Sequence, residues 1–173
     1  MHDGNRLIFI NIETSGNDPK DGHRIIEIAA IEYIGNQTSK YFHRYFNPER
    51  EINFDAQESH GLSLEFLQDK QSFVDVADDL QQLLTGAMVV VHNAPFDVGS
   101  LNYEFNLIGK PSISEMCLGI VDTMRIAKEK RPGQRNDLDA LSRHYGINTS
   151  TSSFQGTLLE ASILAQVYMS MIS

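Results

Sequence analysis

Two side chains at the end of a predicted strand, Asn11 and Glu13, have types and spacing that could serve metal chemistry. They stand in the run LIFINIETSG at 7–16, which predicts a strand over 7–12 leading into an acidic turn. Because side chains alternate along a strand, Asn11 and Glu13 point to the same face. Two carboxylates at this spacing would bind a divalent metal ion, but here one position carries an amide.

Further candidates lie in two later motifs, HNAPFD at 92–97 and QGTLLE at 155–160. Asp97 falls on the first turn of a predicted helix just after a strand, so its carboxylate can project toward the sheet edge where Glu13 emerges. Taken alone, Asp97 is more often a helix-capping acid and Glu13 a solvated loop acid. The pair together favours metal ligation.

The three motifs resemble those of the DEDDh (DnaQ-like) 3′–5′ exonuclease superfamily, most closely those of epsilon-type proofreading subunits of bacterial DNA polymerase III. That superfamily has Asp-x-Glu-Thr-Thr/Ser-Gly, His-Asn-x-x-Phe-Asp and His-x-x-x-x-Asp. The stretches SHGL at 59–62 and RNDLDAL at 135–141 are also similar, and the likeness runs from Leu7 to about Tyr168. The chain departs from the pattern at three positions that carry chemistry: Asn11 for Asp, Gln155 for His and Glu160 for Asp.

The resemblance implies metal-assisted hydrolysis at a DNA 3′ end. In the family, four carboxylates bind two divalent ions, Mg²⁺ or Mn²⁺, about 3.5–4 Å apart, and a histidine takes a proton from the attacking water. Carried over, the metal-ligand positions hold Asn11, Glu13, Asp97 and Glu160. Gln155 stands at the base position, so the catalytic candidates are Glu13, Asp97 and Gln155.

The resemblance also implies a nucleotide site and partners. Six residues match positions around the terminal nucleotide: Asn11, Glu13, Thr14, Asp55, His60 and Phe96. Without the motifs, His60 would be read as a structural residue. The implied partner is a single-stranded DNA 3′ end, with the alpha and theta subunits of DNA polymerase III as partners by analogy, although the fold serves both DNA and RNA.

The three departures predict a weakened catalytic centre. An amide at position 11 removes one negative charge and the bridge between two cations, although Asn11 reads equally well as a turn residue that bonds local backbone. Gln155 cannot accept a proton near neutral pH, and loss of a general base lowers rates by roughly 10²- to 10⁴-fold. The extra methylene of Glu160 displaces its carboxylate, which can lower a rate by about 10²-fold. We therefore expect an exonuclease of strongly reduced or absent activity, or alternatively a catalytically silent nucleic-acid-binding or polymerase-associated module.

Composition limits the class of protein. The chain has 173 residues, 41% of them hydrophobic, which fits a single exonuclease-like domain over 1–173. Its net charge of −9 argues against a broad basic surface for nucleic acid, and the basic run at 128–135 is more often a solvated face than a phosphate track. A single cysteine, Cys117, predicts a small core residue and a reducing compartment. With neither an export signal nor a spanning segment, the prediction is a cytoplasmic protein.

Periodicity predicts a mixed α/β sheet, and the resemblance specifies a ribonuclease-H-like mixed five-stranded sheet flanked by helices. The predicted strands cover 7–12, 25–34, 41–46, 88–91 and, more weakly, 117–121. The predicted helices cover 73–84, capped by Ser72 and Asp75, then about 94 to a stop at Gly109, and 137–145. A last helix follows the Ser/Thr-rich loop at 148–153, with an apolar stripe at Ala161, Leu164, Ala165, Tyr168 and Ile172.

Overall fold

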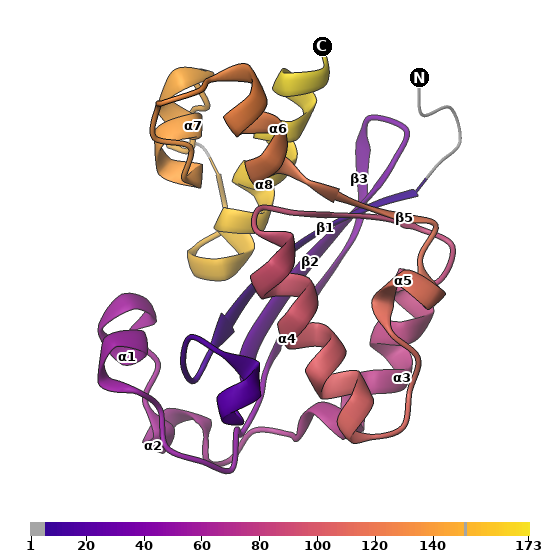
Figure 1. The fold of residues 1–173 in the computed structure, drawn as a ribbon, viewed down its shortest axis with the longest axis vertical. Coiled ribbons are helices and arrows are strands. Elements are labelled where there is room, and N and C mark those ends of the chain that lie inside the picture. Colours follow the sequence, from indigo (N-terminus) through magenta and orange to yellow (C-terminus); the bar gives the residue numbers. More distant parts are fainter. Residues whose placement is uncertain (1–5, 151) are drawn as a thin grey trace.

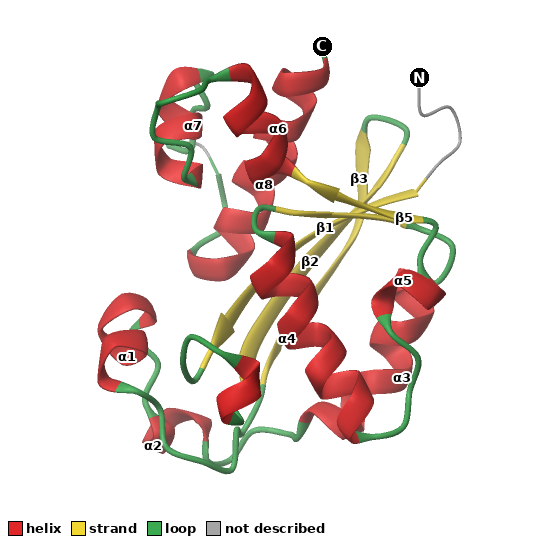
Figure 2. Ribbon diagram, viewed as in Figure 1, coloured by secondary structure: helices red, strands yellow, loops and turns green. Residues whose placement is uncertain are grey.

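The computed structural model describes residues 6–150 and 152–173 and contains a five-stranded mixed sheet (Figures 1 and 2). The strand order is β3-β2-β1-β4-β5. The first three strands form an antiparallel meander: β1 (Arg6–Thr14), β2 (Ile25–Ile34) and β3 (Gln37–Tyr45). The last two run parallel to β1: β4 (Met88–Val91) and β5 (Gly119–Asp122). The predicted mixed five-stranded sheet is therefore confirmed.

Helices cover both faces of this sheet. The helical elements before β4 are η1 (Pro19–Asp21), α1 (Phe54–His60), α2 (Leu64–Leu67) and α3 (Phe73–Leu84). Those after β4 are α4 (Ala94–Leu107), α5 (Ile113–Met116), α6 (Thr123–Lys130), α7 (Leu138–His144) and α8 (Gly156–Ile172). Figure 1 shows α3 and α4 over one part of the sheet and α6, α7 and α8 clustered at another.

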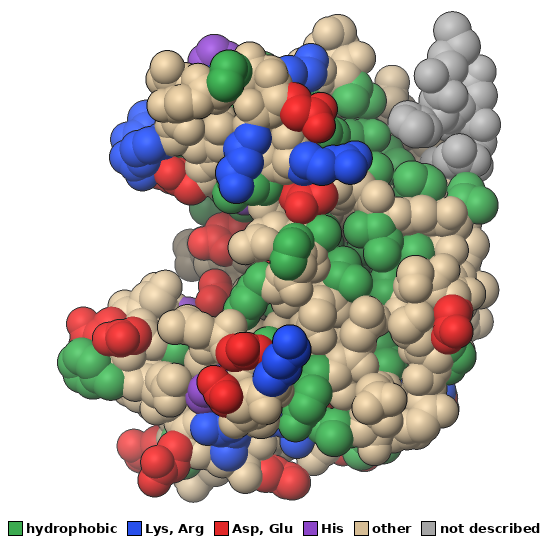
Figure 3. Space-filling view, viewed as in Figure 1, with side chains coloured by type: hydrophobic (Ala, Val, Ile, Leu, Met, Phe, Trp, Pro, Cys, Tyr) green, Lys and Arg blue, Asp and Glu red, His purple; other side chains and the backbone are tan. Residues whose placement is uncertain are grey.

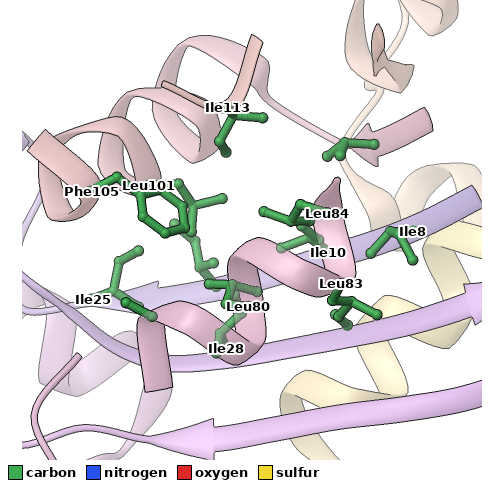
Figure 4. Packing of buried hydrophobic residues seen from close by; sticks show 14 of the residues in the cluster. Ile8, Ile10, Ile25, Ile28, Leu80, Leu83, Leu84, Leu101, Phe105 and Ile113 are labelled. Atoms are coloured by element: carbon green, nitrogen blue, oxygen red, sulfur yellow. The ribbon is translucent and has the colours of Figure 1, made fainter. Parts of the chain in front are cut away.

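The alternation of β1 assigns its side chains to two cores. Ile8, Ile10 and Ile12 are buried with residues of α3 and α4, and the close view in Figure 4 shows Ile10 beside Leu84 of α3. Leu7 and Phe9 are buried instead against Leu164 and Tyr168 of α8. The odd-numbered side chains of β1 therefore face α8, and the next odd positions after Phe9 are Asn11 and Glu13.

Most predicted helix boundaries are confirmed to within a residue or two. The backbone N–H of Ser72 donates to the Asp75 carboxylate at 3.1 Å, which completes the predicted capping box of α3. Gly109, in a left-handed conformation with φ 72°, follows the end of α4. The short helices α1, α2, α5 and α6 were not predicted, because so few residues often show no recognisable periodicity, whereas α7 was predicted with the help of Gly146 after its end.

Three sequence expectations were wrong in detail. The strand predicted at 41–46 is β3, which covers 37–45. The weak strand at 117–121 lies instead at 119–122, because Cys117 ends α5 and is only half-buried. The stripe of α8 does not include Ile172, which is 49% exposed, since Met171 occupies the buried position. The loop at 148–153 includes residue 151, which lies outside the described residues. Over the described ranges, 6–150 and 152–173, no helix has the length and apolar character needed to cross a membrane.

Candidate active site

The carboxyl end of β1 brings Asn11 to α8. The Asn11 Nδ2 group donates a hydrogen bond to the Glu160 carboxylate, 149 residues further along the chain. The same strand places Glu13 directly opposite Glu27 of β2 in the antiparallel register. The sheet and α8 thus gather one amide and several carboxylates that are widely separated in the sequence.

Asp97 reaches the site from the first turn of α4. It is 8% exposed, and its carboxylate accepts hydrogen bonds from the backbone N–H groups of Asn93 and His92. The N-cap residue of α4 is Asn93, and no side-chain hydrogen bond caps the helix, so the capping interpretation of Asp97 is not confirmed. The first turn of α4 places this carboxylate where β4 meets α4, in the lining of the same pocket as Asn11.

Gln155 and Glu160 come from the start of α8. Gln155 is the N-cap residue, is exposed, and provides no side-chain cap for the helix. Glu160 lies just over one turn further on and holds the Asn11 amide. The structure thus brings Asn11, Asp97 and Glu160 to one pocket, whereas Glu13 and Gln155 are not among its lining residues.

The carboxylates raise one another's proton affinity. Burial, followed by the charges of Glu160, Glu27 and Asp97, raises the pKa of Glu13 to about 7. Burial also raises the pKa of Asp97 to about 7, although its backbone hydrogen bonds oppose the shift. The pKa of Glu160 is raised by burial, against the effect of the Asn11 hydrogen bond. Such shifts are typical of carboxyl groups clustered away from solvent.

Of the predicted nucleotide-site residues Thr14, Asp55, His60 and Phe96, only Phe96 is a lining residue of the pocket that holds Asn11 and Asp97. His60 donates from Nε2 to the Thr14 carbonyl at 3.1 Å, and its Nδ1 accepts from the Leu62 backbone N–H at 3.0 Å, which defines the neutral tautomer. Burial lowers the pKa of His60. Phe96 lines the pocket, while Asp55 is exposed on the first turn of α1. His60 thus has a structural contact, to the turn that follows Glu13.

The pocket has a volume of about 470 Å³ and lies between β1, α4, α7 and α8. Figure 3 shows the surface hollowed between the α6–α7 part and the α1 part, with acidic side chains inside. The lining residues are Asn11, Ile12, His92, Asn93, Phe96, Asp97, Leu138, Asp139, Ser142, Thr149, Glu160 and Ile163. A concave site of this size is large enough for a nucleotide.

A family model described as exonuclease (RNase_T) matches residues 8–154 of the chain. The chain belongs to this exonuclease family. It is 41% identical over 166 residues to a DNA polymerase III subunit epsilon of Rickettsia felis, covering 95% of this chain and 72% of that protein. It is 40% identical over 173 residues to the subunit epsilon of Escherichia coli K12, covering 96% and 71%. It is therefore an epsilon-like 3′–5′ exonuclease domain of the DEDDh superfamily.

Solved structures agree with the fold of this exonuclease domain. Exonuclease X in complex with 5′ overhanging duplex DNA matches with a TM-score of 0.75 at 23% identity, over 96% of this chain and 90% of that one. The nuclease domain of 3′hExo, a DEDDh family member bound to rAMP, matches with a TM-score of 0.78 at 14% identity, over 97% and 92%. These likenesses confirm the ribonuclease-H-like arrangement of sheet and helices.

The family generally uses divalent metal ions, but the donor set of this exonuclease domain does not fit the paired-ion arrangement. The Asn11 Nδ2 group, a donor that a cation repels, faces the carboxylate of Glu160. Within residues 6–150 and 152–173, no three His, Cys, Asp or Glu side chains lie close enough together to hold a metal ion. Hard divalent cations prefer several anionic oxygens, which this arrangement does not provide.

The sequence reading missed two parts of the site. The α7 residues Leu138, Asp139 and Ser142 line the pocket, and the similarity noted at 135–141 was the available signal. Glu27 is 5% exposed beside Glu13, and its signal was a carboxylate inside the otherwise apolar run IIEIAAI at 25–31. A charged residue is rarely buried in a strand without a partner.

The basic run at 128–135 covers the end of α6 and the loop after it, and three of its side chains contact other parts of the protein. Lys130 Nζ donates to the Met171 carbonyl at 2.8 Å, and Arg131 donates to the Arg135 carbonyl and to the Asn136 side chain. Arg135 pairs with Asp137 at 3.0 Å. The solvated-face interpretation of this run stays a prediction.

Proposed function

We propose that this exonuclease domain receives the 3′ end of single-stranded DNA in its pocket and hydrolyses it far more slowly than a domain with intact motifs. The observation that carries the proposal is the hydrogen bond from Asn11 to Glu160. It joins two positions that in the family both ligate metal, and it satisfies the Glu160 carboxylate with a protein donor. The position that would bridge two cations therefore carries no anion.

The other candidate residues support the same proposal. Glu13 and Asp97 keep their carboxylates, so the acidic character of the site is retained. Gln155 can hold a water molecule by hydrogen bonding but cannot take its proton. Thr14, Asp55, His60 and Phe96 are proposed to contact the terminal nucleotide, because they match the family's nucleotide positions. Association with the alpha and theta subunits of DNA polymerase III stays a prediction from the same resemblance.

The test is degradation of a 5′-labelled single-stranded oligonucleotide in millimolar Mn²⁺ or Mg²⁺. We expect little or no shortening by the natural chain, and strong shortening by the triple variant Asn11→Asp, Gln155→His, Glu160→Asp. The triple variant with Asp97→Asn added is the inactive control, because it removes a remaining carboxylate. Rapid shortening by the natural chain would contradict the proposal.

A second candidate is a catalytically silent module that binds a 3′ end or a polymerase partner. The same hydrogen bond favours it, because Asn11 replaces a cation as the partner of Glu160. Titration calorimetry with Mn²⁺ separates the two candidates. Binding of two ions per chain would exclude the silent module, whereas binding of a 3′ end without ion uptake would favour it.

A further inference from the structure

Glu27 is a buried carboxylate that connects three elements beside the pocket. It lies on β2 in register with Glu13 and is 5% exposed. Its Oε1 accepts a hydrogen bond from the Thr157 hydroxyl at 2.7 Å, and its Oε2 lies 2.6 Å from His43 Nε2 on β3. Both carboxylate oxygens are thus held by side chains, one from α8 and one from the neighbouring strand.

Thr157 lies in the first turn of α8, between Gln155 and Glu160. That turn has no side-chain cap, since Gln155 makes none. The preceding loop contacts the sheet through the ring of Phe154, which packs on Tyr41 at 4.9 Å between ring centroids. The buried Thr157 hydroxyl therefore provides a directional contact between the start of α8 and the sheet, whereas ring packing allows the helix to slide or rotate.

We propose that Glu27 is a positioning residue that, through Thr157, sets where Gln155 and Glu160 stand at the pocket. Gln155 and Glu160 flank Thr157 by two and three residues, so a shift of the first turn moves both of them. The inference rests on the proposed function in that the pocket is taken to receive a nucleic acid 3′ end. The bond itself belongs to the folded chain and is independent of any ligand.

Removing the Thr157 hydroxyl should release the first turn. Val has nearly the shape of Thr but no donor, so Thr157→Val leaves a buried carboxylate oxygen without its partner. Ser keeps the donor, so Thr157→Ser should behave like the natural chain. Ser162→Ala, two residues beyond Glu160 on the same helix, is the matched control, because its hydroxyl contacts Gln166 and not the sheet.

The direct test is amide hydrogen exchange of peptides that cover 156–161. We expect Thr157→Val to raise exchange there about tenfold, while Thr157→Ser and Ser162→Ala do not, since a hydrogen bond to a charged group is lost only in the first. In a chain that already carries Glu27→Met, adding Thr157→Val should not raise the exchange rate over 156–161 any further. The inference would be overturned if Thr157→Val left the exchange rate unchanged. It would also be overturned if Thr157→Val raised the rate equally in the natural chain and in the Glu27→Met chain. Thr157→Ala replaces the Val variant if that protein does not fold.

The second measurement is the affinity for a 5′-fluorescein-labelled oligothymidylate with a free 3′ hydroxyl, followed by anisotropy. We expect Thr157→Val to raise the Kd about tenfold and Thr157→Ser to restore it. Equal Kd values for the natural chain and Thr157→Val would refute the positioning role and leave the proposed function intact. Failure of the natural chain to bind the oligonucleotide would refute the proposed function, and hydrogen exchange would then decide the positioning role by itself.

Discussion

The substitution Asn11→Asp tests the central feature of the pocket, the hydrogen bond between Asn11 and Glu160. It changes one nitrogen to oxygen, so the shape of the side chain is kept. The donor disappears and a second carboxylate faces Glu160. Without a divalent cation, an attraction therefore becomes a repulsion.

The expected loss of stability follows from two contributions. Two unit charges about 4 Å apart repel by about 1 kcal/mol in water and about 4 kcal/mol near a protein surface. Because part of the Glu160 side chain is open to solvent, the lower part of this range applies, about 1–2 kcal/mol. Loss of the hydrogen bond raises the total to roughly 2–4 kcal/mol. For a domain of this size, the melting temperature should fall by roughly 5–15 °C.

Thermal unfolding in EDTA and in millimolar Mn²⁺ is the assay. In EDTA, Asn11→Asp should melt below the natural chain, because its carboxylates repel. In Mn²⁺ it should recover most of the difference, since an ion at about 100 times its Kd stabilises the folded state by about 2.7 kcal/mol. The natural chain should respond little to Mn²⁺. Asn17→Asp, an exposed asparagine in the loop after β1, controls for added charge.

Two results would refute this reasoning. A melting temperature of Asn11→Asp equal to that of the natural chain in EDTA would mean that the Asn11 amide does not stabilise Glu160. A stabilisation of the natural chain by Mn²⁺ as large as that of the variant would mean that the amide does not disfavour cations. Either result would mean that the substitution at position 11 does not prevent the pocket from binding two metal ions.

Three further predictions concern the same fold. Because the pKa of Glu13 is raised from 4.5 and that of Asp97 from 3.8, each to about 7, the folded state binds protons more tightly than the unfolded chain. Stability should therefore fall as pH rises from about 4 to 7 and level off above, and calorimetry of Glu13→Gln should show a shallower fall. Glu104→Ala should destabilise by about 3–5 kcal/mol in urea unfolding, because it leaves Arg24 without its two-point partner at 2.5 and 2.9 Å, whereas replacing both by apolar residues should cost much less. Phe105→Ala should cost about 3–5 kcal/mol in the same assay, since Phe105 is fully buried, and a loss below about 1 kcal/mol would contradict the core assignment.

The sequence was informative wherever a local pattern carries the structure. The alternation at 7–16 predicted that Asn11 and Glu13 share a face, and the capping pair Ser72 and Asp75 predicted the start of α3. The three motifs predicted the family and hence the mixed five-stranded sheet flanked by helices. Cys117 and Ile172 were misassigned because a one-residue change of register near an element's end reverses burial, and local pattern does not fix that register.

What the sequence by itself determined was the chemistry available: an amide at position 11, a carboxamide at 155 and a carboxylate at 160. Only the tertiary structure decided what those groups do to one another. The bonds from Asn11 to Glu160 and from Thr157 to Glu27 join residues 149 and 130 positions apart, across the interface of sheet and helix. Such contacts and the burial that raises the carboxyl pKa values depend on packing in three dimensions, which spacing along the chain does not encode.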